Sequence, residues 1–191
     1  MRTETVATRF LQLSVLNGFL ALIFTLPILD PMLCIATPPG TFGCKATMDV
    51  VWPGTWILVA YIVFLGAGVG GTLFWGANYY FASRVSNKTQ SNGFLGMAHI
   101  LIWEVGVLLA CGMMAAIGFV GGSFLVAGGT PAVASAKIAE MLPHILSTDP
   151  LSPVYDTPVV VEALGIGVAI LGGLIGFLNF LLLKSEPPSA T

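Results

Sequence analysis

The chain has 191 residues, of which 56% are hydrophobic and only 8% are charged, and its formal net charge is −2. Soluble domains carry about 25% charged residues, so this composition excludes a soluble globular protein and indicates an integral membrane protein. The seven Lys and Arg residues are scattered along the sequence and form no basic cluster, which excludes a nucleic-acid partner bound by phosphate neutralisation and offers no site for anionic lipid. We expect a single all-α domain over residues 1–191, located in the cell membrane.

Four apolar segments follow one another, and each is long enough to cross a bilayer as a helix. They cover about residues 8–29, 55–81, 94–122 and 158–183. Five of the seven basic residues lie before or at the start of the first segment, between the second and third, or after the fourth: Arg2, Arg9, Arg84, Lys88 and Lys184. The positive-inside rule therefore predicts a multi-pass protein with both termini in the cytoplasm.

The first loop lies outside the cell in this topology and contains Cys34 and Cys44. An oxidising compartment favours a disulfide that closes this loop. Two free thiols are the alternative, and a metal site lacks a nearby His or third Cys. Cys111, within the third segment, is expected to be a small packing residue.

The second segment contains the sequence GAGVGG, in which Gly66 and Gly70 form a small-xxx-small pair. Such a pair predicts close approach of another helix. The glycines lie inside an apolar segment with no preceding strand, so a nucleotide-binding loop is excluded. The segment ends in aromatic residues, among them Trp75 and Tyr79, which predict the cytoplasmic membrane interface.

The third segment carries two ionisable side chains, His99 and Glu104. Five residues separate them, which places them about 140° apart around a helix, so they are predicted to meet different neighbours. Glu104 lies near the middle of the span, where a carboxylate is a functional-site hypothesis by default. It could relay protons with a partner subunit, hydrogen-bond across a helix interface in its protonated form, or neutralise a partner's Arg or Lys. For His99, a hydrogen-bonded interface role is favoured over a ligand role.

The last loop, Ser123 to Thr157, is the longest and includes a mildly helical stretch over residues 131–146. The fourth segment follows, and its glycines Gly172 and Gly176 belong to a small-residue stripe that predicts a helix–helix contact face.

Cofactor chemistry has few possible ligands here. A haem held between membrane helices normally needs two axial histidines, and His99 is the one histidine within the apolar segments. We therefore expect this chain to bind no haem or metal by itself. Neither a nucleophile–base pair nor a phosphate loop is present, so no catalytic residue is assigned.

Residues 55–183 resemble the last three helices of the heme-copper oxidase catalytic subunit. The resemblance is carried by GGTLFWGANYYF at 70–81, AHILIWEVGVLL at 98–109 and GGLIGFLNFLL at 172–182. The family's haem-ligating His-x-His pair is absent, because residues 54–57 read GTWI. The resemblance thus implies a degenerate relative without haem ligands, with haem and copper in a partner subunit.

These observations lead to one preferred function. We expect a non-catalytic accessory subunit of a membrane respiratory complex, most of all a heme-copper terminal oxidase, that supports assembly or the proton or quinone environment. Its partners would be other integral membrane subunits and lipids, and no nucleic acid. The alternatives are a small channel or transporter subunit with Glu104 in a polar path, and a subunit of another membrane enzyme such as a monooxygenase.

Overall fold

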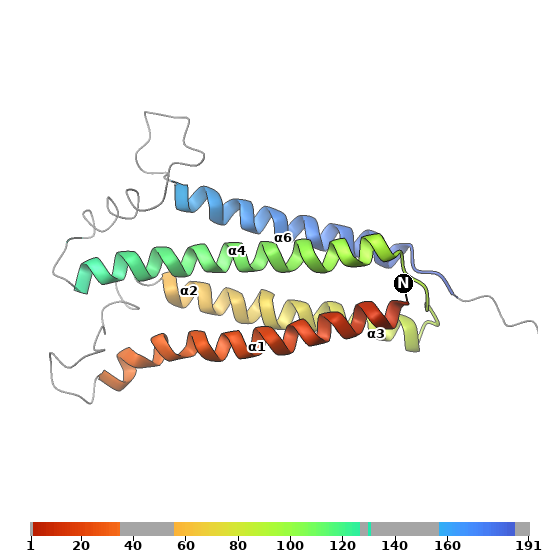
Figure 1. Cartoon of the computed structure of the whole chain (residues 1–191), viewed down its shortest axis with the longest axis horizontal. Helices are drawn as coiled ribbons and strands as arrows, with labels where there is room; N and C mark the ends of the chain where they lie inside the picture. The colour runs from red at the N-terminus through yellow and green to blue at the C-terminus, as the bar shows by residue number, and fades with distance from the viewer. Residues whose placement is uncertain (1, 35–55, 127–129, 131–156, 186–191) are drawn as a thin grey trace, which may run out of the picture.

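The computed structural model describes residues 2–34, 56–126, 130 and 157–185, and in this part of the chain the regular structure is helical (Figure 1). The elements in order are α1 (Thr3–Cys34), α2 (Trp56–Val63), the π-helix η1 (Phe64–Gly71), α3 (Thr72–Arg84), α4 (Gly93–Val126) and α6 (Thr157–Leu181). Because α2, η1 and α3 follow without a break, they form one long helix.

Four spans are long and apolar enough to cross a membrane: Thr3–Thr25, Trp56–Arg84, Gly93–Phe119 and Ala163–Leu181. The predicted all-helical architecture is therefore confirmed, with four helices long and apolar enough to span a membrane within the described residues. The helix α1 begins earlier than expected because its first turn is fixed by the fold, with the Thr3 amide donating to the Thr89 carbonyl at 2.9 Å.

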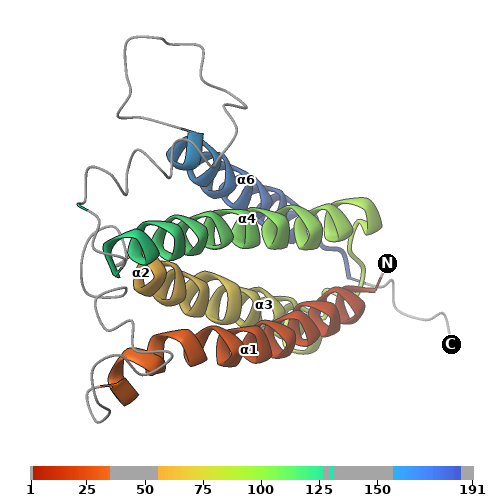
Figure 2. The same ribbon diagram turned by 60° about the vertical axis from the view of Figure 1, so that its left-hand side comes forward.

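The spans lie side by side in the order α6, α4, α2–η1–α3, α1 (Figures 1 and 2). The helix α4 is central to this arrangement, since it packs along α6 on one side and against α2 and η1 on the other. The helix α1 packs mainly on α3 and η1. The start of α1, the end of α3, the start of α4 and the end of α6 meet at one end of the bundle, which we call the terminal end.

Glycines allow α4 and α6 to approach each other closely. A Cβ atom added at Gly106 would collide with the backbone of Ala169, and one added at Gly172 would lie 2.5 Å from the amide nitrogen of Trp103. A Cβ at Gly176 would overlap the imidazole ring of His99. The small-residue face predicted on the fourth segment therefore lies against α4.

The second segment was predicted to pack through Gly66 and Gly70, but within the described part of the chain these glycines do not contact another helix as those of α6 do. Among the described residues, nothing lies within 4 Å of a Cβ added at Gly66, and at Gly70 the nearest atom is the Leu65 carbonyl oxygen of the same helix, at 3.4 Å. The prediction that both glycines pack against another helix is wrong within this chain. The physical reason is the π-helix, whose wider turn changes which residues share a face. Gly71 packs instead, against the ring of Trp103.

The terminal end also corrects the expectation of scattered basic residues. The backbones of Arg2 and Lys184 both pair with that of Gln90, and Lys88 lies two residues before it. Arg2, Lys88 and Lys184 are therefore brought together around the backbone of Gln90. The fold creates a basic cluster that the linear sequence does not contain.

Two predictions lie outside the described residues. Cys34 is the last residue of α1, but neither its side chain nor Cys44 is described, so the disulfide stays a prediction. The helical stretch expected over residues 131–146 also lies outside the described part.

Candidate functional site

A polar site lies near the middle of the bundle, and we call it the Glu104 junction. It comprises the side chains of Ser14, Asn17, Thr72 and Glu104 and the carbonyl groups of Gly68 and Val69. Glu104 lies roughly 16 Å along α4 from Gly93, since a helix rises about 1.5 Å per residue. The junction is therefore well inside the apolar span Gly93–Phe119.

Asn17 of α1 connects the junction. It is fully buried, and its Nδ2 donates to the carbonyl oxygen of Gly68 at 2.8 Å and to Oε2 of Glu104 at 3.3 Å. The amide therefore links α1, η1 and α4. Its Oδ1 atom has no hydrogen-bond partner among the described residues.

The π-helix supplies the acceptors on the other side of the junction. The carbonyl oxygen of Gly68 accepts from Asn17 and also from the hydroxyl of Thr72 at 2.5 Å, while that of Val69 accepts from the hydroxyl of Ser14 at 3.1 Å. In a helix of i→i+5 hydrogen bonds the regular ladder is disturbed, and such segments occur frequently at functional sites. Side chains of α1 thus bond to backbone carbonyl groups of the π-helix, and the carbonyl oxygen of Val69 also accepts from the Thr72 amide of its own helix.

Glu104 is only partly covered by its own chain. Its side chain is half-buried, whereas Val107 and Cys111, further along α4, are buried against Ala21 and Phe64. Asn17 is the one hydrogen-bond donor that the described residues give it. A single amide compensates poorly for a carboxylate within hydrocarbon, so this side chain is suited to receive a proton or a further polar partner.

A second polar site lies closer to the terminal end, and we call it the His99 cluster. It comprises His99 of α4, Tyr79 of α3 and Asn179 of α6, all fully buried. The Tyr79 hydroxyl lies 3.1 Å from Nδ1 of His99 and 3.4 Å from the carbonyl oxygen of Gly176, and it accepts a hydrogen bond from Nδ2 of Asn179 at 3.0 Å.

Aromatic rings enclose the imidazole of this cluster. The ring of Phe10 lies 4.7 Å from that of His99 between centroids, and the ring of Trp75 lies 4.5 Å away, perpendicular to it. Because Phe10 belongs to α1, all four spans meet at His99. Its Nε2 atom has no hydrogen-bond partner among the described residues.

Several functional residues were not recognised from sequence. Tyr79 was expected at the membrane interface, but it is fully buried at the centre of the cluster. Asn179 and Asn17 are isolated amides in apolar segments; for Asn17 this isolation allows a hydrogen bond across a helix interface or a local partner, and its bonds to Gly68 and Glu104 show that it crosses the interface. Their partners come from distant segments, so spacing could not identify them.

The Glu104 junction and the His99 cluster are separate sites, because Glu104 contacts Asn17 whereas His99 contacts Tyr79. Within the described ranges, no three His, Cys, Asp or Glu side chains gather closely enough to hold a metal ion.

No family model matches this chain, and no curated protein or solved structure is similar enough to it to count as a match. The resemblance to the oxidase helices therefore stays a prediction.

Proposed function

We propose that the chain is a non-catalytic subunit of a membrane complex, and that the Glu104 junction lies against a helix of a partner subunit. The half-buried carboxylate of Glu104 carries the proposal. An acidic side chain at the centre of a span costs about 3 kcal/mol on insertion scales, and a hydrogen bond within lipid recovers about 1 kcal/mol. A partner that covers the exposed side of Glu104 would supply the remaining stabilisation.

We further propose that the parent is a respiratory complex, most of all a heme-copper terminal oxidase. Its support is the resemblance of residues 55–183 to helices of the oxidase catalytic subunit. In this proposal haem and copper belong to the partner subunit. This chain would support assembly or the proton or quinone environment next to it.

Of the three roles considered for Glu104, a hydrogen-bonded carboxyl group at a helix interface has the most support. The Asn17 amide already donates to Glu104 Oε2 from another helix, at 3.3 Å. A relay role would require a proton acceptor from the partner, and a charge-neutralising role would require a partner's Arg or Lys. Both would use the same exposed side of the carboxylate.

A small channel or transporter subunit is the second candidate. Its support is the succession of buried polar groups from the His99 cluster, past the indole nitrogen of Trp103, to the Glu104 junction. The rings of Phe10, Trp75 and Trp103 fill the space near His99, however. Water would have to displace these rings to connect the two polar sites.

We propose that the terminal end faces the cytoplasm, because Arg2, Lys88 and Lys184 gather there. The opposite end then faces an oxidising compartment, which supports the disulfide between Cys34 and Cys44. Alkylation of the denatured chain followed by mass spectrometry tests this bridge. Two additional alkyl groups should appear only after reduction, and identical masses with and without reduction would refute the bridge.

Isolation of the complex tests the proposed function. The full chain, carrying an affinity tag, is purified from its native membranes in a mild detergent and separated by native electrophoresis, and haem difference spectra are recorded on the bands. We expect the chain to migrate with haem-containing subunits. Migration as a lone oligomer away from any haem band would overturn the oxidase assignment.

If the chain does join such a complex, replacement of Glu104 by Gln distinguishes the roles of this residue. Unchanged turnover and proton stoichiometry would support the hydrogen-bonded interface role. Loss of proton stoichiometry with intact assembly would support the relay role instead.

A further inference from the structure

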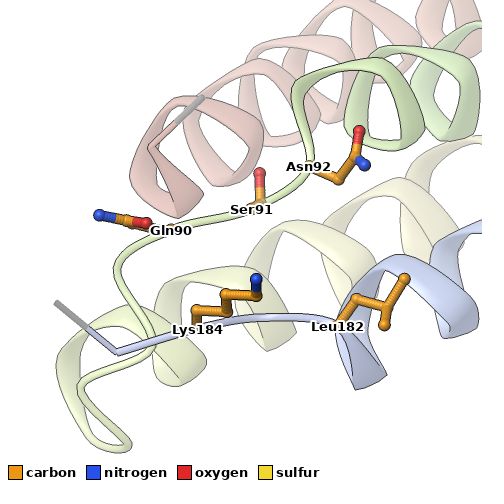
Figure 3. Close-up of a pocket in the computed structure, with 5 residues that line it drawn as sticks. All are labelled: Gln90, Ser91, Asn92, Leu182 and Lys184. Carbon is orange, nitrogen blue, oxygen red and sulfur yellow. The ribbon is translucent and has the colours of Figure 1, made fainter.

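We propose that a pocket at the terminal end binds the phosphate group of an anionic phospholipid. The pocket has a volume of about 300 Å³ and is lined by Gln90, Ser91, Asn92, Leu182 and Lys184 (Figure 3). It lies between the linker that joins α3 to α4 and the segment that follows α6. The inference is independent of the proposed partner of Glu104, because the pocket lies at the start of α4 whereas Glu104 lies near the middle of that helix.

Backbone pairing holds the two walls of the pocket together. The backbone amide of Gln90 donates to the carbonyl oxygen of Lys184 at 3.0 Å. The backbone amide of Lys184 donates in return to the carbonyl oxygen of Gln90 at 2.9 Å. Asn92 is fixed as the N-cap of α4, since its Oδ1 accepts from the amides of Phe94 and Leu95 at 3.0 and 3.2 Å. The polar wall is thus built before any ligand arrives.

Lys184 is the positively charged residue that lines the pocket. Its side chain is exposed and projects across the gap towards the linker (Figure 3). Lys88 does not line the pocket, but its Nζ donates to the carbonyl oxygen of Leu183 at 3.3 Å, between the lining residues Leu182 and Lys184 in the sequence. A basic pocket between membrane helices is a recognised type of site for anionic lipid headgroups.

The acidic residue described at this end does not neutralise the pocket. Glu4 pairs with Arg84, whose Nε lies 3.1 Å from Oε1 of Glu4. The basic residue Arg2 also lies at this end of the bundle, where its backbone pairs with that of Gln90. Glu186, two residues after Lys184, lies outside the described residues.

A free phosphate ion and a lipid headgroup share the same chemistry, and the surroundings favour the lipid. The pocket lies where two spans end, since its lining residues Asn92 and Leu182 adjoin Gly93 and Leu181, which is the level of headgroups. Leu182 lines the pocket and begins a stripe of exposed leucines that continues along α6: Leu171, Leu174, Leu178 and Leu182, each at least half exposed. An acyl chain attached to the bound phosphate would lie along this stripe.

Native mass spectrometry of the full chain in a neutral detergent tests the proposal. The probes are phosphatidylglycerol, phosphatidylcholine and inorganic phosphate, and the proteins are the wild type, Lys184→Gln and Arg9→Gln. Arg9 is the matched control, because it is a basic and exposed residue of α1 that does not line the pocket. Circular dichroism melting confirms that each variant keeps its helices.

We expect phosphatidylglycerol to bind the wild type more tightly than either other probe. Lys184→Gln removes one basic residue near the anionic lipid and should weaken the binding of phosphatidylglycerol about fivefold. The factor by which Arg9→Gln weakens this binding should be less than half of that. Equal losses in both variants would show diffuse charge attraction and overturn the site. Inorganic phosphate binding as tightly as phosphatidylglycerol would overturn the lipid assignment.

Discussion

The Glu104 junction and the His99 cluster are both polar sites within the membrane spans, but they differ in closure. In the His99 cluster, Tyr79, His99 and Asn179 are fully buried, and all four spans contribute to it. At the junction, Asn17 is fully buried while Glu104 is only half-buried. The difference indicates that the cluster serves the fold of the chain itself, whereas the junction is open to something outside it.

The largest loss of stability is expected for a substitution at Gly176, where α6 packs directly against the His99 ring. Gly176→Leu places a side chain into the space of the His99 ring, and overpacking of this kind should lower the stability by roughly 1–3 kcal/mol. Thermal unfolding in detergent, followed by circular dichroism, measures the loss. Gly167→Leu is the control, because nothing lies within 4 Å of a Cβ at Gly167. Equal destabilisation by both would contradict a tightly closed cluster.

Removal of the Tyr79 hydroxyl should have the next largest effect. Tyr79→Phe leaves the Asn179 amide and His99 Nδ1 without their partner, which should cost about 1–2 kcal/mol. The same unfolding measurement applies, with Tyr80→Phe as control because Tyr80 is 47% exposed. If Tyr79→Phe melts like the wild type, the hydrogen bonds of the cluster do not stabilise the fold.

Asn17 should show a smaller effect that depends on Glu104. Asn17→Leu removes the bonds to Gly68 and Glu104, and should destabilise the isolated chain by about 1 kcal/mol. A double-mutant cycle with Glu104→Leu, which removes the acceptor, isolates the pair, with an expected coupling of about 0.6 kcal/mol. Strict additivity of the two substitutions would mean that the contact between Asn17 and Glu104 contributes nothing.

Hydrophobic length was sufficient to predict the four spans, because crossing a bilayer demands about 20 apolar residues per helix. The glycine face of α6 was predictable for a similar reason, since small residues permit close helix packing in lipid. The failure at Gly66 has a local cause, because the π-helix breaks the spacing on which the prediction depended.

The candidate sites were only half predictable. Glu104 and His99 stood out as ionisable residues in apolar segments, but their partners did not. Asn17 and Glu104 are 87 residues apart, and Tyr79 and Asn179 are 100 apart. The basic pocket likewise depends on backbone pairing between residues 90 and 184. Contacts across such separations arise from the packing of helices, which a pattern within one helix does not contain.

The central claim is that a partner covers Glu104 in the native membrane. It is tested most directly with dicyclohexylcarbodiimide, a hydrophobic reagent that modifies carboxyl groups within membranes, applied to native membranes and to the purified chain. The Glu104→Gln variant serves as the control, and modification is read by mass spectrometry of the peptide. We predict modification of Glu104 in the purified chain and protection in native membranes. Equal modification in both would contradict a partner at the Glu104 junction.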